Sequence, residues 1–157
     1  MSNNVVALRN EVVNDDQVIA HALGILAKRC APGEEFSSPH DFRRFLQLKL
    51  GARKNECFGV IFLDHRHRLL RFAELFEGTI NGASVYPRVV VQHVLEANAA
   101  AVVFYHNHPS GLCDPSAADR SLTTRLKEAL ALIDVKVLDH FIVTASDCYS
   151  FAEHGLI

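Results

Sequence analysis

Apolar residues recur every three or four positions in the first third of the chain. This spacing predicts a helix from about residue 15 to about Cys30, which the segment Ala31-Pro32-Gly33 ends. A second helix is expected to open at Ser37-Ser38-Pro39 and to end at Gly51. Its apolar face consists of Phe42, Phe45, Leu46 and Leu50.

Short apolar runs in the middle of the chain are typical of strands. Residues 57–63 and 69–76 are such runs, and the polar turn between them predicts an antiparallel hairpin. A loop at residues 78–82 precedes Pro87, which suits the first position of a helix to about Asn98. Residues 99–105 are apolar throughout, as in a strand that is buried on both faces.

The last third begins with a loop, residues 106–115, that is rich in His, Pro, Ser, Gly and Asp. A long helix is expected from about Ser116, followed by strands at residues 135–143 and 149–151. Strands and helices that alternate in this way predict an α/β or α+β fold, a mixed sheet with helices packed on it. A length of 157 residues fits one domain with one core.

Charge, cysteine spacing and the pattern of apolar residues make several classes of protein less probable for this chain. The net charge is -2 and the pI about 6.5, whereas a nucleic-acid binder usually carries a basic excess or a basic face. The four cysteines form no C-x-x-C pair, which speaks against a disulfide framework and a cysteine-rich zinc site. No signal peptide and no apolar run of membrane-spanning length is seen, so a cytoplasmic protein without membrane association is expected.

The segment from His106 to Asp119 carries the candidate chemistry. His106 and His108 lie two residues apart at a strand end, so both imidazoles should point to the same side. Asp119 lies in the first turn of the following helix and can add a carboxylate. Two histidines and one carboxylate, with water in a fourth position, describe a catalytic zinc site. Such a site lowers the pKa of its water toward about 7 and supplies a hydroxide nucleophile.

Each part of this pattern also has a purely structural interpretation. Ser116 and Asp119 could be a helix N-cap with its capping acid, a role that is compatible with metal binding. The two histidines could be ordinary polar residues at a strand end. A second H-x-H, His65-Arg66-His67, lies in a charged turn without an acid at matching spacing, and we interpret it as solvated turn. H-x-H alone is therefore a weak signal, and its extended context makes the first one strong.

That context resembles the JAMM motif of the MPN-plus (JAB) metalloproteases: His106, His108, seven intervening residues, Ser116, two residues and Asp119. The segment His-Asn-His-Pro-Ser-Gly is similar to the sequences of the RadC-like branch of this family. The resemblance covers roughly residues 39–157 of a single domain and leaves the N-terminal helix, about 15–30, outside. Further segments that look like the family are Asn55-Glu56-Cys57-Phe58-Gly59-Val60, Gly78-Thr79-Ile80, Val85-Tyr86-Pro87-Arg88, Leu138-Asp139-His140-Phe141-Ile142-Val143 and Tyr149-Ser150-Phe151-Ala152-Glu153.

The resemblance implies a three-layer α-β-α fold with a mixed sheet, like that of cytidine deaminases. It also implies roles: His106, His108 and Asp119 would hold Zn²⁺, Glu56 would act as general base and then general acid, and Ser116 would donate to the oxyanion. Without the family, Glu56 would be interpreted as a surface residue. The implied activity is hydrolysis of peptide or isopeptide bonds in a protein or peptide substrate, and the oligomeric state stays open.

The chain departs from the family in three places. Val89 stands where the family usually has glutamate, so any role of that position is in doubt here. Cys113 lies in the metal loop, where a thiol could coordinate zinc, although a small loop residue is the simpler interpretation. Longer RadC proteins carry an N-terminal region linked with DNA binding, and this chain is expected to be too short to include it.

Two other functions are considered beside the hydrolase. A non-catalytic module that binds DNA or a repair partner is suggested by the RadC name and by a basic cluster, Arg43, Arg44, Lys49, Arg53 and Lys54, although a solvated helix face is the simpler explanation. A base deaminase would need H-x-E and P-C-x-x-C, and neither occurs. For Asp139-His140, a structural hydrogen bond in the sheet is favoured over orientation of a metal ligand.

Overall fold

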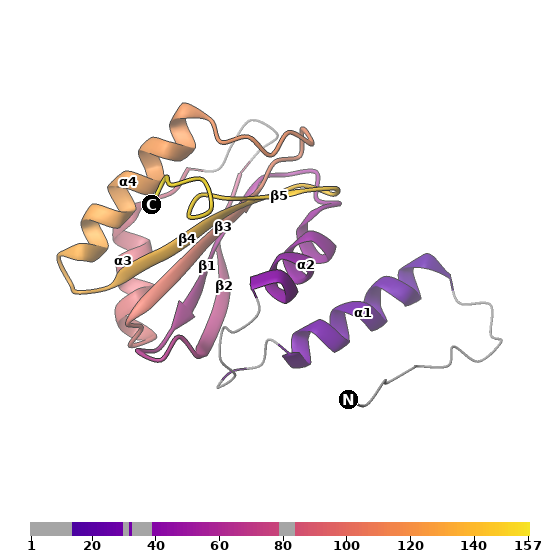
Figure 1. Cartoon of the computed structure of the whole chain (residues 1–157), viewed down its shortest axis with the longest axis horizontal. Coiled ribbons are helices and arrows are strands. Elements are labelled where there is room, and N and C mark those ends of the chain that lie inside the picture. The colour runs from indigo at the N-terminus through magenta and orange to yellow at the C-terminus, as the bar shows by residue number, and fades with distance from the viewer. Residues whose placement is uncertain (1–13, 30–31, 33–38, 79–83) are drawn as a thin grey trace.

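The computed structural model describes residues 14–29, 32, 39–78 and 84–157 (Figure 1). The expected helix stop at Ala31 and Gly33, the expected helix opening at Ser37-Ser38, and most of the loop at residues 78–82 lie outside these residues. Five strands are described: β1 Cys57–Leu63, β2 Leu69–Glu77, β3 Ala101–Asn107, β4 Lys136–Val143 and β5 Cys148–Ser150. Four helices are described: α1 Asp15–Arg29, α2 Pro39–Leu50, α3 Pro87–Glu96 and α4 Ala117–Ala131.

The strands form one mixed sheet in the order β2-β1-β3-β4-β5. β1 is antiparallel to both of its neighbours, which confirms the predicted hairpin of β1 and β2. β3 and β4 are parallel and are joined through α4, and β5 returns antiparallel to β4. β3 is thus the central strand, and the end of this strand is held on both sides by its neighbours.

Alternating side chains of the sheet enter two separate cores. On one face, Val60 and Phe104 pack with Val94 of α3 and Leu126 of α4. On the other face, residues from β1, β3 and β4 pack with the apolar side of α2, and α1 adds Leu26. Helices therefore cover both faces of the sheet, as Figure 1 shows, and the predicted three-layer α-β-α fold is confirmed.

The expected strand at residues 99–105 is displaced by two positions. β3 begins at Ala101 and continues through His106 and Asn107, which the sequence pattern assigned to the loop. The apolar run ends at Tyr105, but backbone pairing with β1 and β4 continues beyond it, and both polar side chains are buried. His106 is therefore a buried residue of the central strand.

The polar hairpin turn agrees with its interpretation as solvated turn. Both of its histidines, His65 and His67, are exposed. The carboxylate of Asp64 accepts hydrogen bonds from the backbone N–H groups of Arg66 and Arg68, at 2.8 and 2.9 Å, and so closes the turn. This second H-x-H is not part of the histidine and acid cluster described below.

Three members of the basic cluster are paired with acids. Lys49 Nζ and Arg53 Nη2 lie 3.4 and 2.8 Å from the two carboxylate oxygens of Glu74. Arg43 forms an ion pair with Glu153. The two remaining cations are exposed. Because much of the local positive charge is balanced within the domain, this cluster offers little support for phosphate contacts, and DNA binding stays a prediction.

In the described part of the chain, no helix has both the length and the apolar character that crossing a bilayer requires.

Candidate metal centre

The end of β3 places the two histidines. His106 pairs with Phe58 of β1 and Ile142 of β4, and its side chain is only 2% exposed. His108 follows directly after the strand, and its backbone N–H donates to the carbonyl of Val143 at 2.9 Å. This hydrogen bond continues the strand pairing for one more residue and fixes the second imidazole beside the first.

The N-terminus of α4 places the acid. Ser116 is the N-cap: its Oγ accepts a hydrogen bond from the backbone N–H of Asp119 at 3.1 Å. In return, Asp119 Oδ2 accepts from the backbone N–H and the hydroxyl of Ser116, at 2.7 and 2.6 Å. The predicted capping box is therefore present, and it orients the carboxylate instead of competing with a role at the site.

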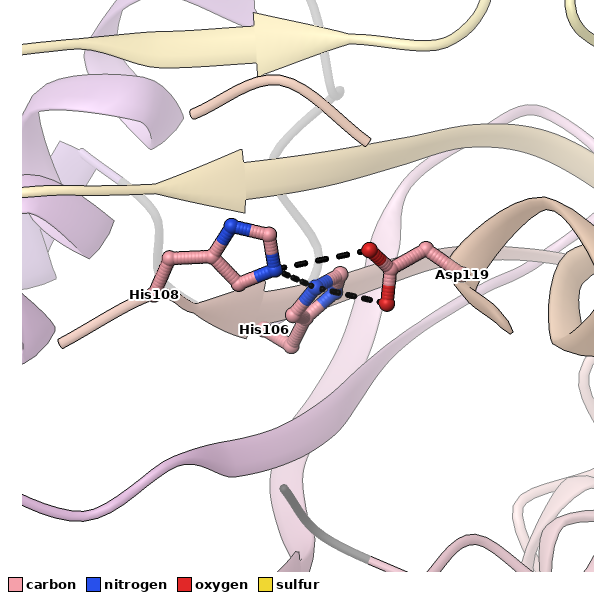
Figure 2. A group of neighbouring side chains, drawn as sticks. All are labelled: His106, His108 and Asp119. Atoms are coloured by element: carbon pink, nitrogen blue, oxygen red, sulfur yellow. Dashed lines mark hydrogen bonds and ion pairs between the residues drawn. The ribbon is translucent and has the colours of Figure 1, made fainter. Parts of the chain in front are cut away.

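The three side chains meet at one point (Figure 2). The Nε2 atoms of His106 and His108 are 2.9 Å apart. Asp119 Oδ1 lies 3.3 Å from His106 Nε2, and Oδ2 lies 3.5 Å from His108 Nε2. One potential ligand atom from each residue falls within 4.8 Å of the others, so the group could hold a metal ion. The roles of these residues as ligands remain predictions.

Electrostatics keep the carboxylate ionised. Burial alone would raise the pKa of Asp119, but its contacts with His106, His108 and Ser116 outweigh burial and hold this pKa well below the usual range. The hydrogen bond with Asp119 raises the pKa of His108, against the effect of burial, and the carbonyl of Leu112 adds to the rise. The ionised carboxylate of Asp119 therefore gives the cluster a negative charge, which favours the binding of a cation beside it.

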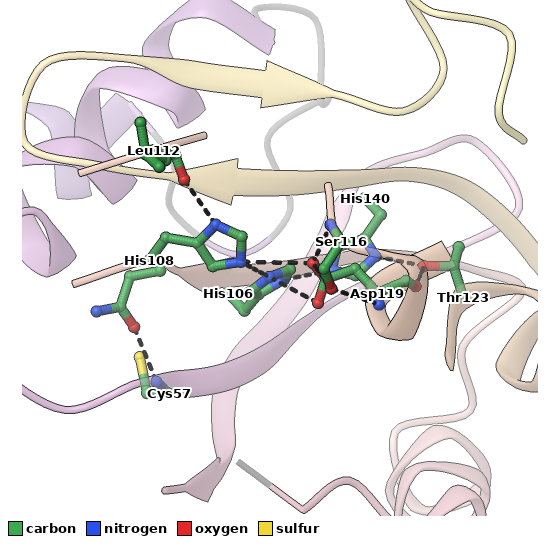
Figure 3. Close-up of polar contacts among 9 residues, drawn as sticks. Cys57, His106, His108, Leu112, Ser116, Asp119, Thr123 and His140 are labelled. Carbon is green, nitrogen blue, oxygen red and sulfur yellow. Dashed lines mark hydrogen bonds and ion pairs between the residues drawn. The ribbon is translucent and has the colours of Figure 1, made fainter. Parts of the chain in front are cut away.

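Both imidazoles present the same nitrogen to Asp119 because the other nitrogen is occupied (Figure 3). His108 Nδ1 donates to the carbonyl of Leu112 at 2.7 Å. His106 Nδ1 lies 2.8 Å from Nε2 of His140. Partners of this kind fix the orientation of metal-binding histidines, and the arrangement directs both Nε2 atoms to the predicted metal position.

Glu56 lies in the segment before β1 and outside the His-His-Asp group. It is partly buried, and its backbone carbonyl accepts from the N–H of Gly78 at 2.8 Å. Its charge contributes to the raised pKa of His108, after the larger effect of Asp119. The role of this carboxylate as a proton carrier stays a prediction.

Two polar residues at the site were not predicted as functional. Asn107, between the two histidines, uses its side chain to bind the backbone of Asn55 and Cys57 on either side of Glu56. Thr123, one turn after Asp119, is buried and lies 2.7 Å from His140 Nδ1. A polar residue on the apolar face of a predicted helix is the signal that could have revealed Thr123.

The structural hydrogen bonds predicted for Asp139-His140 are present, and His140 also contacts a predicted metal ligand. Asp139 is structural: it accepts hydrogen bonds from Ser150 Oγ and the backbone N–H of Ala152, at 2.6 and 2.9 Å. His140, in contrast, contacts His106 directly. The parallel pairing of β3 and β4 brings the two rings together, so the hydrogen bond of His140 lies within the sheet, as predicted, and its partner is also a predicted metal ligand. Burial holds the pKa of His140 well below its usual value.

The structure also places two residues at which the chain departs from the family, Cys113 and Val89. Cys113 Sγ donates to Asp147 Oδ2 at 3.4 Å, and it is not a member of the cluster formed by His106, His108 and Asp119. Val89 is half-buried on α3. Neither residue contributes a ligand atom to the described site.

Comparison with known proteins identifies the family of this chain. A family model for the RadC-like JAB domain matches residues 36–156. The chain is similar to a UPF0758 protein of Vibrio cholerae, with 52% identity over 141 residues, 90% of this chain and 89% of the relative. It is also similar to UPF0758 proteins of Marinobacter nauticus, with 56% identity over 80% of this chain, and of Methylibium petroleiphilum, with 55% identity over 84%.

The coverage of these relatives differs. The chain spans 56% and 60% of the length of the last two, so these proteins have substantial further sequence. None of the three names states an activity. Because the family model covers most of the chain and the relatives share more than half of the aligned residues, this chain belongs to the RadC-like JAB domain family.

Proposed function

We propose that this chain is a zinc-dependent hydrolase that cleaves peptide or isopeptide bonds. The observation that carries the proposal is the convergence of His106 Nε2, His108 Nε2 and a carboxylate oxygen of Asp119 on one point at the end of the central strand. Membership of a JAB domain family, in which such sites occur in metalloproteases, adds support.

The donor set fits zinc. Two imidazole nitrogens and one carboxylate oxygen are ligand types that zinc takes in catalytic sites, where a fourth position stays open. The Nδ1 atoms of both histidines are already hydrogen-bonded, so each ring has its Nε2 directed to the site. In Asp119, Oδ2 takes part in the capping box, and Oδ1 faces His106.

In this proposal, different residues of the chain would bind the metal and transfer the proton. When bound, zinc supplies a Lewis acid that polarises a carbonyl and lowers the pKa of water. His106, His108 and Asp119 would hold and orient the metal. Glu56 would accept a proton on its carboxylate and return it to the leaving amine, as a general base and then a general acid.

The oxyanion role of Ser116 requires a change in its hydrogen bonds. In this structure its hydroxyl donates to Asp119 Oδ2 at 2.6 Å. To donate to a substrate oxyanion, the hydroxyl has to turn away from Asp119, while the backbone N–H of Ser116 continues to hold the carboxylate. Removal of the Ser116 hydroxyl should therefore affect turnover more than metal content.

Metal content is the first test. The wild-type chain should bind one zinc ion per molecule by mass spectrometry, and both His106→Ala and Asp119→Asn should lose it. The matched control is the double variant His65→Ala/His67→Ala, which removes the other H-x-H in the exposed turn and should keep the zinc. A wild-type chain that takes up no stoichiometric zinc would refute the proposal.

Hydrolysis is the second test. Fluorogenic peptide and isopeptide libraries would be screened with the zinc-loaded chain. Cleavage by the wild type should fall by at least about 100-fold in Glu56→Gln, because loss of general acid–base catalysis typically costs about 10²–10⁴-fold, while zinc content stays at one ion. If Glu56→Gln cleaves as fast as the wild type, the proposed mechanism is wrong.

A further inference from the structure

A chain of hydrogen bonds connects the two predicted ligands His106 and Asp119 behind the site (Figure 3). His106 Nδ1 lies 2.8 Å from His140 Nε2, and His140 Nδ1 lies 2.7 Å from Thr123 Oγ1. Thr123 Oγ1 is 2.6 Å from the backbone carbonyl of Asp119. We infer that Thr123 and His140 are positioning residues that hold His106 in the tautomer whose Nε2 carries no proton, so that this nitrogen is ready to bind metal.

The direction of the chain follows from its last member. A carbonyl oxygen can only accept, so the Thr123 hydroxyl donates its single proton to the Asp119 carbonyl. This is the usual bond of a helical threonine to the carbonyl four residues earlier. With its proton used, Thr123 Oγ1 can only accept from His140, and His140 Nδ1 must therefore carry the proton of that contact.

The surroundings of His140 determine the next step. Its ring is fully buried and packs against the rings of Phe58, Phe104 and Phe151. An uncharged imidazole is the stable form among apolar rings, and with Nδ1 protonated its Nε2 is a bare acceptor. His106 Nδ1 must then donate to it, so in the neutral ring of His106 the proton lies on Nδ1, and Nε2, on the side of Asp119, carries none.

His108 shows why His106 needs this support. The Nδ1 of His108 donates directly to a backbone carbonyl, that of Leu112, and a carbonyl cannot reverse the direction of the bond. The Nδ1 partner of His106 is another imidazole, which can either donate or accept. Without Thr123, the pair His106–His140 could adopt either direction, and one of these places a proton on the nitrogen that faces the metal position.

The inference deepens the proposed function, on which it rests only for the statement that His106 binds metal. The test uses the full chain and compares Thr123→Val, which keeps the shape but removes the hydroxyl, with Thr123→Ser, which restores a hydroxyl. The matched control is Thr124→Val, because Thr124 makes the same kind of bond to the carbonyl four residues earlier, at 3.0 Å, on the exposed side of α4.

Two readouts are measured on each variant. Long-range ¹H–¹⁵N NMR of the metal-free chain reports the tautomers of His106 and His140 without any need for metal or activity. A competition titration with a chromophoric chelator reports the affinity for zinc. The backbone ¹H–¹⁵N spectrum checks that each variant keeps the fold.

The wild type should show His106 and His140 both protonated at Nδ1. Thr123→Val should populate the Nε2–H form of His106 and weaken zinc binding by about 10- to 100-fold, the range typical for partners of metal ligands. Thr123→Ser should restore both readouts, and Thr124→Val should change neither. A folded Thr123→Val that keeps wild-type tautomers and binds zinc within about two-fold of the wild type would overturn the inference.

The results that would refute the proposed function differ from those that would refute the positioning role of Thr123 and His140. If the wild-type chain does not bind zinc but Thr123→Val changes the tautomer of His106, the hydrogen-bonded chain stands and the metallohydrolase is refuted. If the wild type binds zinc and the tautomers do not respond to Thr123, the hydrolase stands and the positioning role is refuted.

Discussion

The side-chain oxygen of Asn107 accepts a hydrogen bond from the backbone N–H of Cys57 at 2.8 Å, in the buried end of the sheet. The amide nitrogen of the same side chain donates to the carbonyl of Asn55 at 3.1 Å. These two backbone groups flank Glu56, so one side chain from the strand that carries the histidines holds the segment that carries the predicted proton carrier.

Asn107→Ala should therefore uncouple Glu56 from the metal centre. Loss of two partly buried hydrogen bonds should lower the free energy of unfolding by about 2–3 kcal/mol, which urea denaturation measures. We also expect the rate of hydrolysis to fall by at least about 10-fold, because misplacement of a catalytic group is costly. Zinc content should remain at one ion, since no ligand is touched.

Asn107→Asp distinguishes the contributions of the two hydrogen bonds. A carboxylate can still accept from the Cys57 N–H but cannot donate to the Asn55 carbonyl. Its activity should be reduced as in the alanine variant. Wild-type hydrolysis by a folded Asn107→Ala would show that Glu56 does not depend on this side chain.

The stereochemistry of the strand explains which parts of the site could be predicted. The period of two places His106 and His108 on one side, and the Ser116–Asp119 spacing is that of a capping box, so both followed from local sequence. The contact between His106 and His140 spans 34 positions and depends on the register of β3 against β4. No local pattern contains that register, so the sequence could name Asp139-His140 as a candidate partner of a metal ligand but could not show that His140 contacts His106.

The position of the strand end could not be predicted for a related reason. The apolar run indicated an end at Tyr105, but His106 and Asn107 are buried polar residues that satisfy their hydrogen bonds across the sheet and to the segment before β1. Hydrophobicity alone cannot distinguish such residues from a solvated loop. Polar residues buried at a strand end are a common feature of functional sites, where local sequence rules fail.

Gly59 lies under the ring of Tyr105 on the neighbouring strand. A methyl group at Gly59 would come within 2.1 Å of the ring carbon Cζ, so the ring would have to move within a packed core. Gly59→Ala should therefore lower the free energy of unfolding by about 1–3 kcal/mol or more, measured by urea denaturation.

Gly24→Ala is the matched control for that substitution. Gly24 lies on the exposed side of α1 with nothing within 4 Å of an added methyl group, so alanine should raise stability by about 0.5–1 kcal/mol through its helix propensity. If Gly59→Ala were as stable as the wild type, the close packing of β1 against Tyr105 would be contradicted.

The hydroxyl of Tyr105 is buried and has no hydrogen-bond partner among the residues that the structure describes. Burial accordingly raises the pKa of Tyr105. Tyr105→Phe removes an unsatisfied polar group and should be neutral or stabilise the fold by up to about 1 kcal/mol. Tyr86→Phe, on an exposed ring, should change stability by less than about 0.5 kcal/mol. A loss of stability in Tyr105→Phe would show that the hydroxyl has a partner.

The turn between β1 and β2 should make stability depend on pH. The pKa of Asp64 is lowered to about 2, mainly by the backbone N–H of Arg68, with smaller effects of the Arg68 guanidinium and the N–H of Arg66. The unfolded value is about 3.9. A carboxyl group whose pKa is lower in the folded state stabilises the fold above the unfolded pKa, and this contribution is lost as the pH falls from about 4 to about 2.

Asp64→Asn keeps an acceptor for the two N–H groups and removes the charge. Its melting temperature should be below that of the wild type at pH 7, and the difference should shrink below about pH 4. Thermal unfolding followed by circular dichroism between pH 3 and pH 7 measures this. A difference that stays constant over the whole range would mean that the charge of Asp64 contributes nothing.

Cys113 lies in the loop between the predicted ligands, but its thiol is not part of the group that they form. Its hydrogen bond goes to Asp147 in the turn between β4 and β5. Burial raises the pKa of Cys113, and the hydrogen bond and charge of Asp147 raise it further. Because the thiolate is the reactive form, alkylation at pH 7 should be slow, and Asp147→Asn should accelerate it.

A Cys30→Ser background leaves three thiols for this experiment. Burial raises the pKa of Cys57 to about 11 and that of Cys148 to about 12, so both should react more slowly than Cys113 with iodoacetamide. Peptide mapping identifies the modified residue. Since the Cys113 thiol is not part of the His-His-Asp group, the chain alkylated at this position should retain its zinc. Loss of zinc on alkylation of Cys113 would instead show that this loop must stay unmodified for the metal site to form.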